Sequence, residues 1–441
     1  MIKFLLNKKI LILIFLFFAS FSFGSFLERT GIFSITSKIN HFVNNSGLKK
    51  VKDIIRYDLL NKKKNEKEKK IIYSNYYDFE LTEIQRPSYS KYGGIDFFNE
   101  KILYVDKEGV AWIRENNAFL KINKELIPNN SVFFKKEFGQ SSLLWFGVKD
   151  ILVIKKLDES YLFASTNNYN FEKKCHYLSL YLKKLKNNLS SQTKWEPVFN
   201  TNCLVEHKVG KSTFMSINMS SGGRIAKLNN EEVLLSVGDY YFDGVNDSNM
   251  VNTSESLYGK IIKINFVNKK FETYADGLRN VQGLLVTKNG IYSTEHGPKG
   301  GDELNFIEYK KNYGWPSATY GVNYNTKEWP LDKKNKNHSI KNFSKPMMSW
   351  IPTIAPSQLV EVKSDNELKR WDKDILISSL KAKSLFRIKR KDYNNLILIE
   401  KIYTDFRIRD IIENDEIFYL LEDGAPIIWK MKKINYSNKL E

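Results

Sequence analysis

Short apolar runs alternate with turn-forming residues along most of the chain after Tyr73. The clearest pair is Ile102–Val105 and Val110–Ile113, which flank the loop sequence Asp106-Lys-Glu-Gly109. Two β-favouring runs around a short loop with glycine are typical of a β-hairpin. Similar runs recur further along the chain, at Val233–Val237, Lys260–Ile264, Gly290–Thr294, Ile375–Ser378, Leu385–Ile388, Ile417–Leu421 and Ile427–Trp429.

No long amphipathic helix interrupts this series, which argues against a parallel α/β fold because parallel strands need crossover helices. Many short antiparallel strands leave exposed edges unless the sheets close on themselves. The pattern therefore predicts an all-β fold over residues 81–433, with a β-propeller favoured and a pair of β-sandwiches as the alternative. Internal repeats are weak in the sequence, so periodicity alone does not give the number of blades.

The N-terminus has the organisation of a secretory signal. Lys3, Lys8 and Lys9 precede the apolar stretch Ile10–Phe18, and small residues follow it. A basic start, an apolar middle and a small-residue end are typical of a signal peptide, although the stretch is almost long enough to span a bilayer. Residues 1–26 are therefore predicted to be a signal peptide or a membrane anchor. The protein is expected to be exported and either periplasmic or anchored on the outer side of the cytoplasmic membrane.

The chain is strongly basic, with a formal net charge of +19 at pH 7. Part of the excess lies in a lysine-rich run between Lys49 and Lys70, inside a segment, 27–80, that is predicted to be helical or irregular. Such a run is either a solvated helix or linker, or a contact with anionic lipid headgroups near the apolar N-terminus. No nucleic-acid-binding motif accompanies it, so we expect no nucleic-acid partner.

The chain contains only two cysteines, Cys175 and Cys203. Export places them in an oxidising environment, where two cysteines can pair. Their separation is compatible with adjacent strands. A disulfide between them is therefore predicted, and two buried free thiols are the alternative.

A glycine-rich turn beside two carboxylates is a candidate metal site. Gly297-Pro298 and Gly300-Gly301 bend the chain directly before Asp302 and Glu303. Glycine lets the backbone approach a small ligand closely, and calcium accepts backbone carbonyl and carboxylate oxygens. The segment predicts a calcium site or, without a metal, a plain acidic turn.

Four cations lie at predicted strand ends or turns, namely Arg279, Lys381, Arg407 and Arg409. Each of them taken alone is an ordinary surface residue. If one end of a propeller gathers them, they would suit a ligand with several carboxylates, because arginine binds carboxylates through two parallel hydrogen bonds.

Several motifs together carry a family resemblance. Gly277-Leu-Arg-Asn-Val-Gln-Gly283 is followed by Glu295-His-Gly-Pro-Lys-Gly-Gly-Asp-Glu303 and then by Asn312-Tyr-Gly-Trp-Pro316. Gly222-Gly-Arg-Ile225 and Val237-Gly-Asp239 precede them. In this order the segments resemble the glucose/sorbosone dehydrogenase family, over about residues 85–432. The resemblance implies a six-bladed β-propeller that binds pyrroloquinoline quinone (PQQ) and calcium, oxidises a sugar or related hydroxyl compound, and passes electrons to an external acceptor.

The resemblance also implies roles for individual residues. Gly297 and Pro298 would offer carbonyls to the calcium that contacts the quinone, and Asp302 and Glu303 would serve a neighbouring structural calcium. Arg279 would stabilise charge that develops on the quinone oxygen. The remaining cofactor-binding residues would be Asn280, Lys381, Arg407 and Arg409.

The chain departs from the family at the catalytic base. Well-known members carry a histidine four residues before the arginine of the Gly-Gly-Arg segment, and the matching residue here is Ser220. A serine hydroxyl is not a general base near neutral pH unless another base activates it. His296 and His207 are the candidate substitutes.

Three hypotheses follow from this departure. The first is a PQQ- and calcium-dependent oxidoreductase, which the retained cations favour. The second is a non-catalytic propeller of the cell envelope that binds a carbohydrate or a cofactor, which the missing histidine favours. The third is another propeller enzyme, such as a calcium-dependent lactone hydrolase.

Overall fold

The computed structural model of the chain describes residues 69–88, 90–122, 126–138, 146–156, 159–185, 194–205, 220–241, 251, 253–322 and 343–436. The predicted signal or anchor at 1–26 lies outside these residues. The lysine-rich run does too, apart from its last two residues. Among the helices of the described residues, none is long and apolar enough to cross a membrane.

The described strands form six antiparallel sheets, which we call blades 1 to 6. Blade 1 contains β3 (Gly93–Phe98), β4 (Lys101–Asp106), β5 (Ala111–Glu115) and β6 (Ala118–Lys121). Blade 2 contains β7 (Val148–Lys156), β8 (Glu159–Asn170), β9 (Cys175–Leu185), β10 (Glu196–Asn200) and β11 (Leu204–Val205). Blade 3 contains β12 (Gly222–Lys227), β13 (Glu232–Val237), β14 (Lys260–Asn265) and β15 (Phe271–Ala275).

The second half of the chain supplies the other blades. Blade 4 contains β16 (Val281–Thr287), β17 (Gly290–Glu295), β18 (Asp302–Ile307) and β19 (Met348–Trp350). Blade 5 contains β20 (Pro356–Glu361), β21 (Ile375–Ser379), β22 (Ser384–Arg390) and β23 (Leu396–Tyr403). Blade 6 contains β24 (Ile408–Asn414), β25 (Ile417–Glu422), β26 (Ile427–Lys433), β2 (Asp78–Gln85) and β1 (Lys70–Tyr73). Two short helices, α4 (Ser131–Phe138) and the 3₁₀ helix η4 (Lys369–Trp371), lie in connections.

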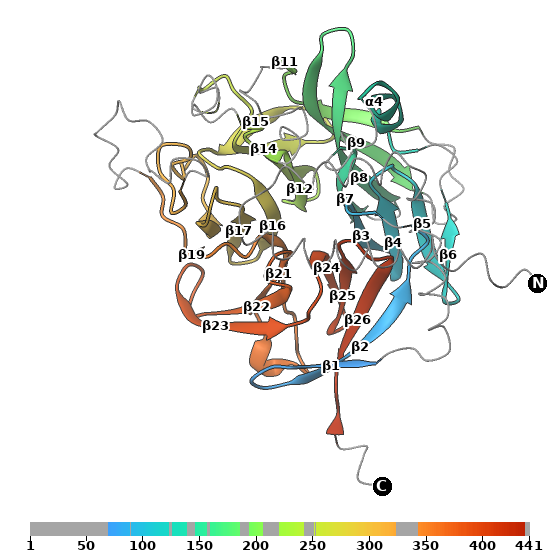
Figure 1. Cartoon of the computed structure of the whole chain (residues 1–441), viewed down its shortest axis with the longest axis vertical. Helices are drawn as coiled ribbons and strands as arrows, with labels where there is room; N and C mark the ends of the chain where they lie inside the picture. Colours follow the sequence, from blue (N-terminus) through green and yellow to red (C-terminus); the bar gives the residue numbers. More distant parts are fainter. Residues whose placement is uncertain are drawn as a thin grey trace, which may run out of the picture. The chain divides into compact units, whose positions relative to one another are not determined.

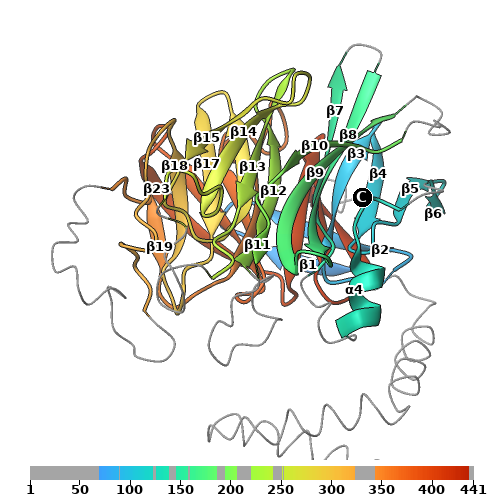
Figure 2. The ribbon, with the colours of Figure 1, turned by 90° about the horizontal axis from the view of Figure 1, so that it is seen from above.

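The blades close into a ring. The innermost strands β3, β7, β12, β16, β20 and β24 contact one another in sequence, and β24 returns to β3 (Figures 1 and 2). The first and last described strands of the propeller share blade 6, where β2 pairs with β26 from Phe79 opposite Lys433 to Gln85 opposite Ile427. This pairing removes the free edge of β26. The predicted all-β, six-bladed propeller is confirmed.

The propeller begins earlier in the sequence than residue 81. Strand β1 and the start of β2 lie inside the segment 27–80 that was expected to be helical or irregular. Elsewhere the strand predictions agree with the structure, and the hairpin of Ile102–Val105 with Val110–Ile113 is observed as β4 and β5.

Apolar side chains fill the space between each pair of neighbouring blades. Phe163 of β8 packs with Leu235 of β13 between blades 2 and 3, and equivalent clusters lie at the other interfaces. Alternate residues of each strand therefore face a neighbouring blade, which is why the sequence shows short alternating or continuous apolar runs.

Polar side chains join the inner strands directly. Asp96 Oδ2 accepts the Val153 amide at 2.6 Å, and Asp150 Oδ2 accepts the Ile225 amide at 2.8 Å. Asp410 Oδ2 accepts the Ile95 amide at 3.1 Å, which joins blade 6 to blade 1. Gln358 and Ser357 of β20 make the corresponding bonds to blades 4 and 6. These bonds fix the inner strands relative to one another, and with them the residues at the strand ends.

The carboxyl of Asp96 makes a pH-dependent contribution to stability. Burial raises its pKa from 3.8 to about 7, and the nearby carboxyls of Asp410 and Asp150 add to the shift. The native state therefore binds this proton more tightly than the unfolded state, so the associated stability is lost as pH rises from about 4 to about 7. We expect Asp96→Asn to lose less unfolding free energy than the wild type between pH 5 and pH 8, as measured by urea unfolding.

The control for this prediction is Asp392→Asn. Asp392 is exposed, and hydrogen bonds from Asn395 lower its pKa below 3.8, so it does not titrate between pH 5 and pH 8. An unchanged pH slope in Asp96→Asn would contradict the prediction.

A disulfide ties the outer part of blade 2. Cys175 at the start of β9 is bonded to Cys203, with the two Cα atoms 5.4 Å apart. The adjacent pairing of β11 with β9 brings the second cysteine to this position.

Candidate active site

The six inner strands line the central channel side by side, and their N-terminal ends gather at one end of it. We call this end the channel mouth. The residues that precede or begin the inner strands there are Tyr92, Lys149, Ser220, Arg279, Arg407 and Arg409.

Arg279 is held rigidly in the mouth. Its Nη1 atom donates to the carbonyls of His296 and Gly297, both at 2.9 Å. Its guanidinium lies 5.6 Å from the ring centre of Tyr241 and 5.3 Å from that of Trp315. The side chain is only 7% exposed. Two aromatic rings and two carbonyls fix the planar cation in one orientation, as a site for developing negative charge requires.

Asp239 lies beside Arg279 and receives a set of converging donors. Its carboxylate accepts hydrogen bonds from Ser220 Oγ at 2.5 Å, the Tyr241 amide at 3.0 Å and Trp315 Nε1 at 2.9 Å. Burial raises the pKa of Asp239, and the Arg279 charge together with these donors opposes the shift. The outcome is a buried carboxylate in direct contact with the Ser220 hydroxyl.

A second cationic group lies on the other side of the mouth. The Tyr92 ring is 4.4 Å from Lys149 Nζ and 4.4 Å from the guanidinium carbon of Arg409. Burial lowers the pKa of Lys149 well below its ordinary value, and the charges of Arg409 and Lys107 lower it further. Nearby cations that oppose each other's charge favour an anionic ligand.

A hydrogen-bond chain connects the two groups. Gln282 Oε1 lies 3.5 Å from Arg409 Nη1, and Gln282 Nε2 donates to Asn280 Oδ1 at 2.9 Å. Asn280 also accepts the Gly222 amide at 3.1 Å. The structure thus brings the sequence-predicted residues Arg279, Asn280 and Arg409 together.

Arg407 and Lys381 lie at the rim. The Arg407 side chain is 45% exposed, pairs with Asp423 at 3.0 Å and reaches the Leu380 carbonyl at 3.4 Å. Lys381 is the next residue and is exposed, and its ammonium forms no hydrogen bond or ion pair with another described residue. Of the predicted cofactor ligands, Lys381 is the one that the structure leaves outside the bonded cluster.

The glycine-rich turn brings backbone oxygens together. A methyl group at Gly297 would lie 2.3 Å from the carbonyl oxygens of both Gly300 and Gly301, so only glycine fits there. Asp302 anchors this turn: it accepts the Gly297, Ile354 and Ala355 amides at 3.1, 2.8 and 2.7 Å and also the Thr353 hydroxyl. These donors use the roughly four acceptor sites of a carboxylate. Asp302 therefore acts as a structural staple of the turn and has little capacity left for a metal.

Glu303 forms a buried carboxyl pair with Glu295. Asn305 Nδ2 donates to both, at 3.3 and 2.9 Å. Burial first, and then the neighbouring Glu295, raise the pKa of Glu303 well above 4.5, and burial raises that of Glu295 to about 7. Within the described part of the chain, no group of three or more His, Cys, Asp or Glu side chains could hold a metal. Any metal beside this turn would need backbone carbonyls as well as these carboxyls.

His296 lies under the same turn. Its Nε2 atom is 2.7 Å from the Pro356 carbonyl, to which it donates, and burial lowers the pKa of the ring. The ring is therefore neutral, with one nitrogen committed to backbone. His207, the other candidate base, lies outside the described residues.

The sequence motifs missed several residues of the mouth. Tyr92 and Lys149 carry no motif; Tyr92 directly precedes Gly93 at the start of β3, and Lys149 is the second residue of β7. Asp239 and Trp315 are in quoted motifs, but only the structure shows that they meet at Ser220 and Arg279.

The sequence matches one protein family along most of the propeller. Residues 147–429, well over half of the chain, match the glucose/sorbosone dehydrogenase family. Curated relatives include an uncharacterised protein of Synechocystis, 30% identical over 52% of this chain and 58% of the relative. The aldose sugar dehydrogenase YliI of Escherichia coli is 29% identical over 42% of this chain and 54% of the relative. The chain thus matches just over half the length of these relatives.

Solved structures agree on the architecture. The soluble aldose sugar dehydrogenase of Escherichia coli, in its apo-form, superposes with a TM-score of 0.65 at 19% identity and covers 81% of this chain and 99% of its own. The PQQ-bound aldose sugar dehydrogenase of Streptomyces coelicolor gives a TM-score of 0.57 at 15% identity over 84% and 99%. At such identities the likeness supports the fold, and the family follows from the sequence match. This protein belongs to the glucose/sorbosone dehydrogenase family.

Proposed function

We propose that this protein is a PQQ- and calcium-dependent oxidoreductase that oxidises an aldose or a related hydroxyl compound and passes electrons to an external acceptor. The observation that carries the proposal is the convergence of Arg279, Arg409 and Lys149 at one channel mouth. We further propose that the protein works outside the cytoplasm, as its N-terminal sequence indicates.

The charges of the mouth suit a tricarboxylate. Four cations lie there, namely Lys149, Arg279, Arg407 and Arg409, against the carboxylates of Asp239 and Asp423. A ligand with several carboxylates would offset the excess positive charge. Arg279, Asn280 and Arg409 would hold such a cofactor inside the mouth, and Arg407 and Lys381 would close over it from the rim.

The carbonyl-rich turn suits calcium. Gly297 offers its carbonyl next to Arg279, and a carbonyl has a second lone pair after accepting one hydrogen bond. Glu303, with Glu295, is the carboxyl group closest to this turn that remains for a second ion. When bound, PQQ supplies a quinone that accepts hydride, and calcium polarises its accepting carbonyl.

The substrate proton needs an acceptor, and Ser220 with Asp239 provides one. The Ser220 hydroxyl already donates to Asp239, so it can pass its own proton to the carboxylate while it accepts the proton of the substrate hydroxyl. Burial makes Asp239 a stronger base than an exposed aspartate. His296 is less suitable because its Nε2 donates to a backbone carbonyl.

The proposal is tested by reconstitution of the purified protein with PQQ and calcium. We expect calorimetry to show PQQ binding in the presence of calcium, and dye reduction to follow when aldoses are added. Arg279→Leu should weaken PQQ binding by at least about tenfold, because it removes a charge-assisted contact in a buried site.

Two results would contradict the proposed oxidoreductase function. An absence of heat on titration of PQQ with calcium present would end the proposal. Tight PQQ binding without dye reduction for any sugar would instead select the non-catalytic binding propeller. Lys227→Ser, an exposed lysine of blade 3 at the opposite end of β12 from the mouth, serves as the matched control and should leave PQQ binding unchanged.

A further inference from the structure

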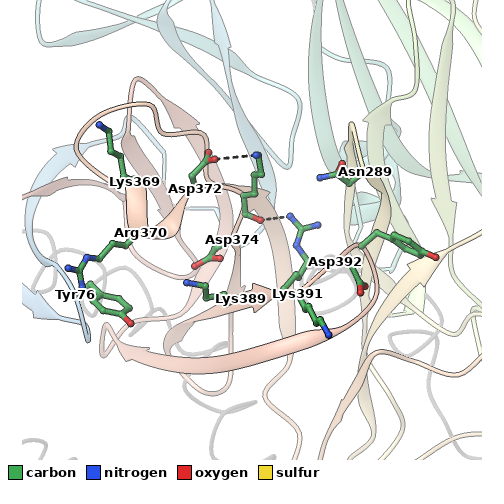
Figure 3. A pocket seen from close by; sticks show the side chains of 12 residues that line it. Tyr76, Asn289, Lys369, Arg370, Asp372, Asp374, Lys389, Lys391 and Asp392 are labelled. Carbon is green, nitrogen blue, oxygen red and sulfur yellow. Dashed lines mark hydrogen bonds and ion pairs between the residues drawn. The ribbon is translucent and has the colours of Figure 1, made fainter.

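A charged groove lies at the end of the propeller opposite the channel mouth. It has a volume of about 670 Å³ and is formed by residues 369, 370 and 372–374 of the β20–β21 loop, residues 389–393 at the β22–β23 turn, Tyr76 and Asn289 (Figure 3). We call it the far-end groove. These segments follow the C-terminal ends of β16, β20 and β22 or precede β2, so they lie away from Arg279 and Ser220. No residue of the mouth lines the groove.

Buried ion pairs hold two of the lining residues, Asp374 and Arg390, in place. Arg387 is fully buried and donates to Asp374 at 2.7 Å and to Glu400 at 2.6 Å. Arg390, whose side chain is 5% exposed, donates to Glu361 at 2.7 Å and to the Lys373 carbonyl. These bonds tie the β22–β23 hairpin to the β20–β21 loop. The groove walls are therefore fixed before any ligand arrives, which lowers the entropic cost of binding.

Arg390 also has unused hydrogen-bonding capacity. Its Nη1 atom is buried and has no hydrogen-bond partner among the described residues. The Arg390 guanidinium lies 4.8 Å from the ring centre of Tyr292 and also interacts with the Tyr292 hydroxyl. Arg390 therefore contributes positive charge behind the groove wall.

The rim of the groove carries four cations that form no direct ion pair. Lys369, Arg370, Lys389 and Lys391 line it, and none of them forms an ion pair with a described acid. Of the lining acids, Asp374 is paired with Arg387 and Asp372 with Lys373, the latter at 3.7 Å. Asp392 accepts hydrogen bonds from Asn395 in its own turn. The four cations therefore outnumber the one lining acid, Asp392, that has no ion pair of its own.

Two exposed tyrosines line the groove together with these cations. Tyr76 is 46% exposed and lies 5.0 Å from the guanidinium of Arg370. Tyr393 is 52% exposed and is supported from behind by Phe306, with ring centres 5.1 Å apart. The Tyr393 carbonyl accepts the Tyr292 hydroxyl at 2.6 Å, which fixes the turn. Exposed aromatic faces on a fixed scaffold offer apolar surface at little entropic cost.

We propose that the far-end groove binds an anionic saccharide, that is, a sugar with a phosphate or carboxylate group. The oxyanion would bind between Lys389 and Lys391, with the buried charge of Arg390 behind them, and the sugar ring would pack on Tyr393 with Asn289 within reach of its hydroxyls. The groove volume falls within the range of small-ligand sites. The site is separate from the mouth, so the protein would hold this sugar independently of the compound it oxidises.

The test is calorimetry on the full protein without PQQ or calcium, so that its outcome does not depend on the proposed activity. The probes are glucose 6-phosphate and trigalacturonate, with glucose and orthophosphate as the neutral and sugar-free comparisons. We expect at least one anionic sugar to bind at least about tenfold more tightly than either comparison, because it alone uses both the cations and the ring. The preferred anionic sugar identifies whether phosphate or carboxylate is the natural group.

Four variants test whether the anionic sugar binds in the far-end groove. Lys389→Ser with Lys391→Ser should weaken it at least about tenfold, whereas Lys227→Ser with Lys270→Ser removes the same charge from blade 3 and should leave it unchanged. Arg279→Leu at the mouth should also leave it unchanged. Tyr393→Ala, with its fold checked by thermal unfolding, should weaken sugar binding and spare orthophosphate.

Several outcomes would overturn the proposal. These are no binding of either anionic sugar, equal loss in the groove and control double variants, or loss in Arg279→Leu. Orthophosphate binding as tight as that of the sugars, with no effect of Tyr393→Ala, would also overturn it, because the groove would then be a simple anion site.

Discussion

Replacing Arg224 with methionine is expected to reduce the free energy of unfolding by about 3–5 kcal/mol, the usual cost of removing one partner of a buried ion pair. Arg224 is buried in β12 and donates from Nη1 to Asp150 at 2.9 Å and to Asp410 at 3.3 Å. Its Nε and Nη2 atoms donate to the carbonyls of Gln282 and Arg409, both at 2.7 Å. One side chain thus joins blades 2, 3, 4 and 6.

The loss of unfolding free energy in Arg224→Met arises from the buried partners that the arginine leaves without a donor. Without the guanidinium, two buried carboxyls face each other and two carbonyls lose their donor. Urea unfolding measures the effect. Lys101→Met is the matched control: it removes a lysine from an ion pair with Glu115 in which the side chains are 49% and 34% exposed, and it should cost less than about 1 kcal/mol.

A second variant separates charge from packing. Adding Asp150→Asn to Arg224→Met removes one of the stranded charges and should recover part of the lost stability. A loss below about 1 kcal/mol in Arg224→Met, or a further loss in the double variant, would show that the central ion pairs do not stabilise the ring.

The alternation of short apolar runs was sufficient to predict the class of fold. Each strand packs one or both faces against a neighbouring blade, so the runs around Leu103, Leu235 and Leu420 are apolar whatever the loops between them contain. The start of the propeller was not predictable in this way. Strands β1 and β2 lie in a segment rich in Lys, Asn and Tyr, and β2 is held by pairing with β26 from the far end of the chain. Long-range pairing of this kind leaves little local signal.

The site could be predicted only where its residues share a motif. Arg279, Asn280 and Gly297 belong to contiguous segments, so the sequence located them. Lys149 and Tyr92 come from other blades, and only ring closure brings them beside Arg409. Tyr92 even lies outside the residues that match the family.

Asp302 lies in a motif, but the motif does not fix its role. A carboxylate after a glycine-rich turn is compatible with calcium binding and with backbone anchoring, because both use the same oxygens. The choice depends on Ile354 and Ala355, which lie about fifty residues away in sequence and donate to Asp302 only in the folded chain. The sequence alone could not distinguish these two roles.

Replacing Asp239 with asparagine is expected to lower kcat/KM of the PQQ-reconstituted protein by about 10²–10⁴-fold, the usual contribution of a general base. An asparagine whose oxygen takes the Oδ1 position still accepts the Tyr241 amide and the Ser220 hydroxyl, loses the Trp315 bond because its NH2 group is a donor, and cannot take up a proton. PQQ affinity should change much less than kcat/KM. That comparison separates a loss of proton transfer from a loss of the cofactor site.

The pH profile provides a readout that a merely structural role would not affect. In the wild type, activity should fall at low pH as Asp239 becomes protonated, which gives the pH–activity profile an acid limb. Because burial raises the pKa of Asp239, this acid limb should lie above the ordinary pKa of an aspartate. The limb should be absent in Asp239→Asn. Ser220→Ala should lower the rate and keep the limb, because the carboxylate remains and can act through water.

Ser220→His tests whether Asp239 can support a direct base at position 220. An imidazole beside Asp239 would be a direct base, so we expect a higher rate than in the wild type and a limb near the histidine pKa of about 6.5. An Asp239→Asn variant with wild-type activity and an unchanged acid limb would show that the proton goes elsewhere. His296 would then be the next group to test, because its second ring nitrogen is not used in the bond to Pro356.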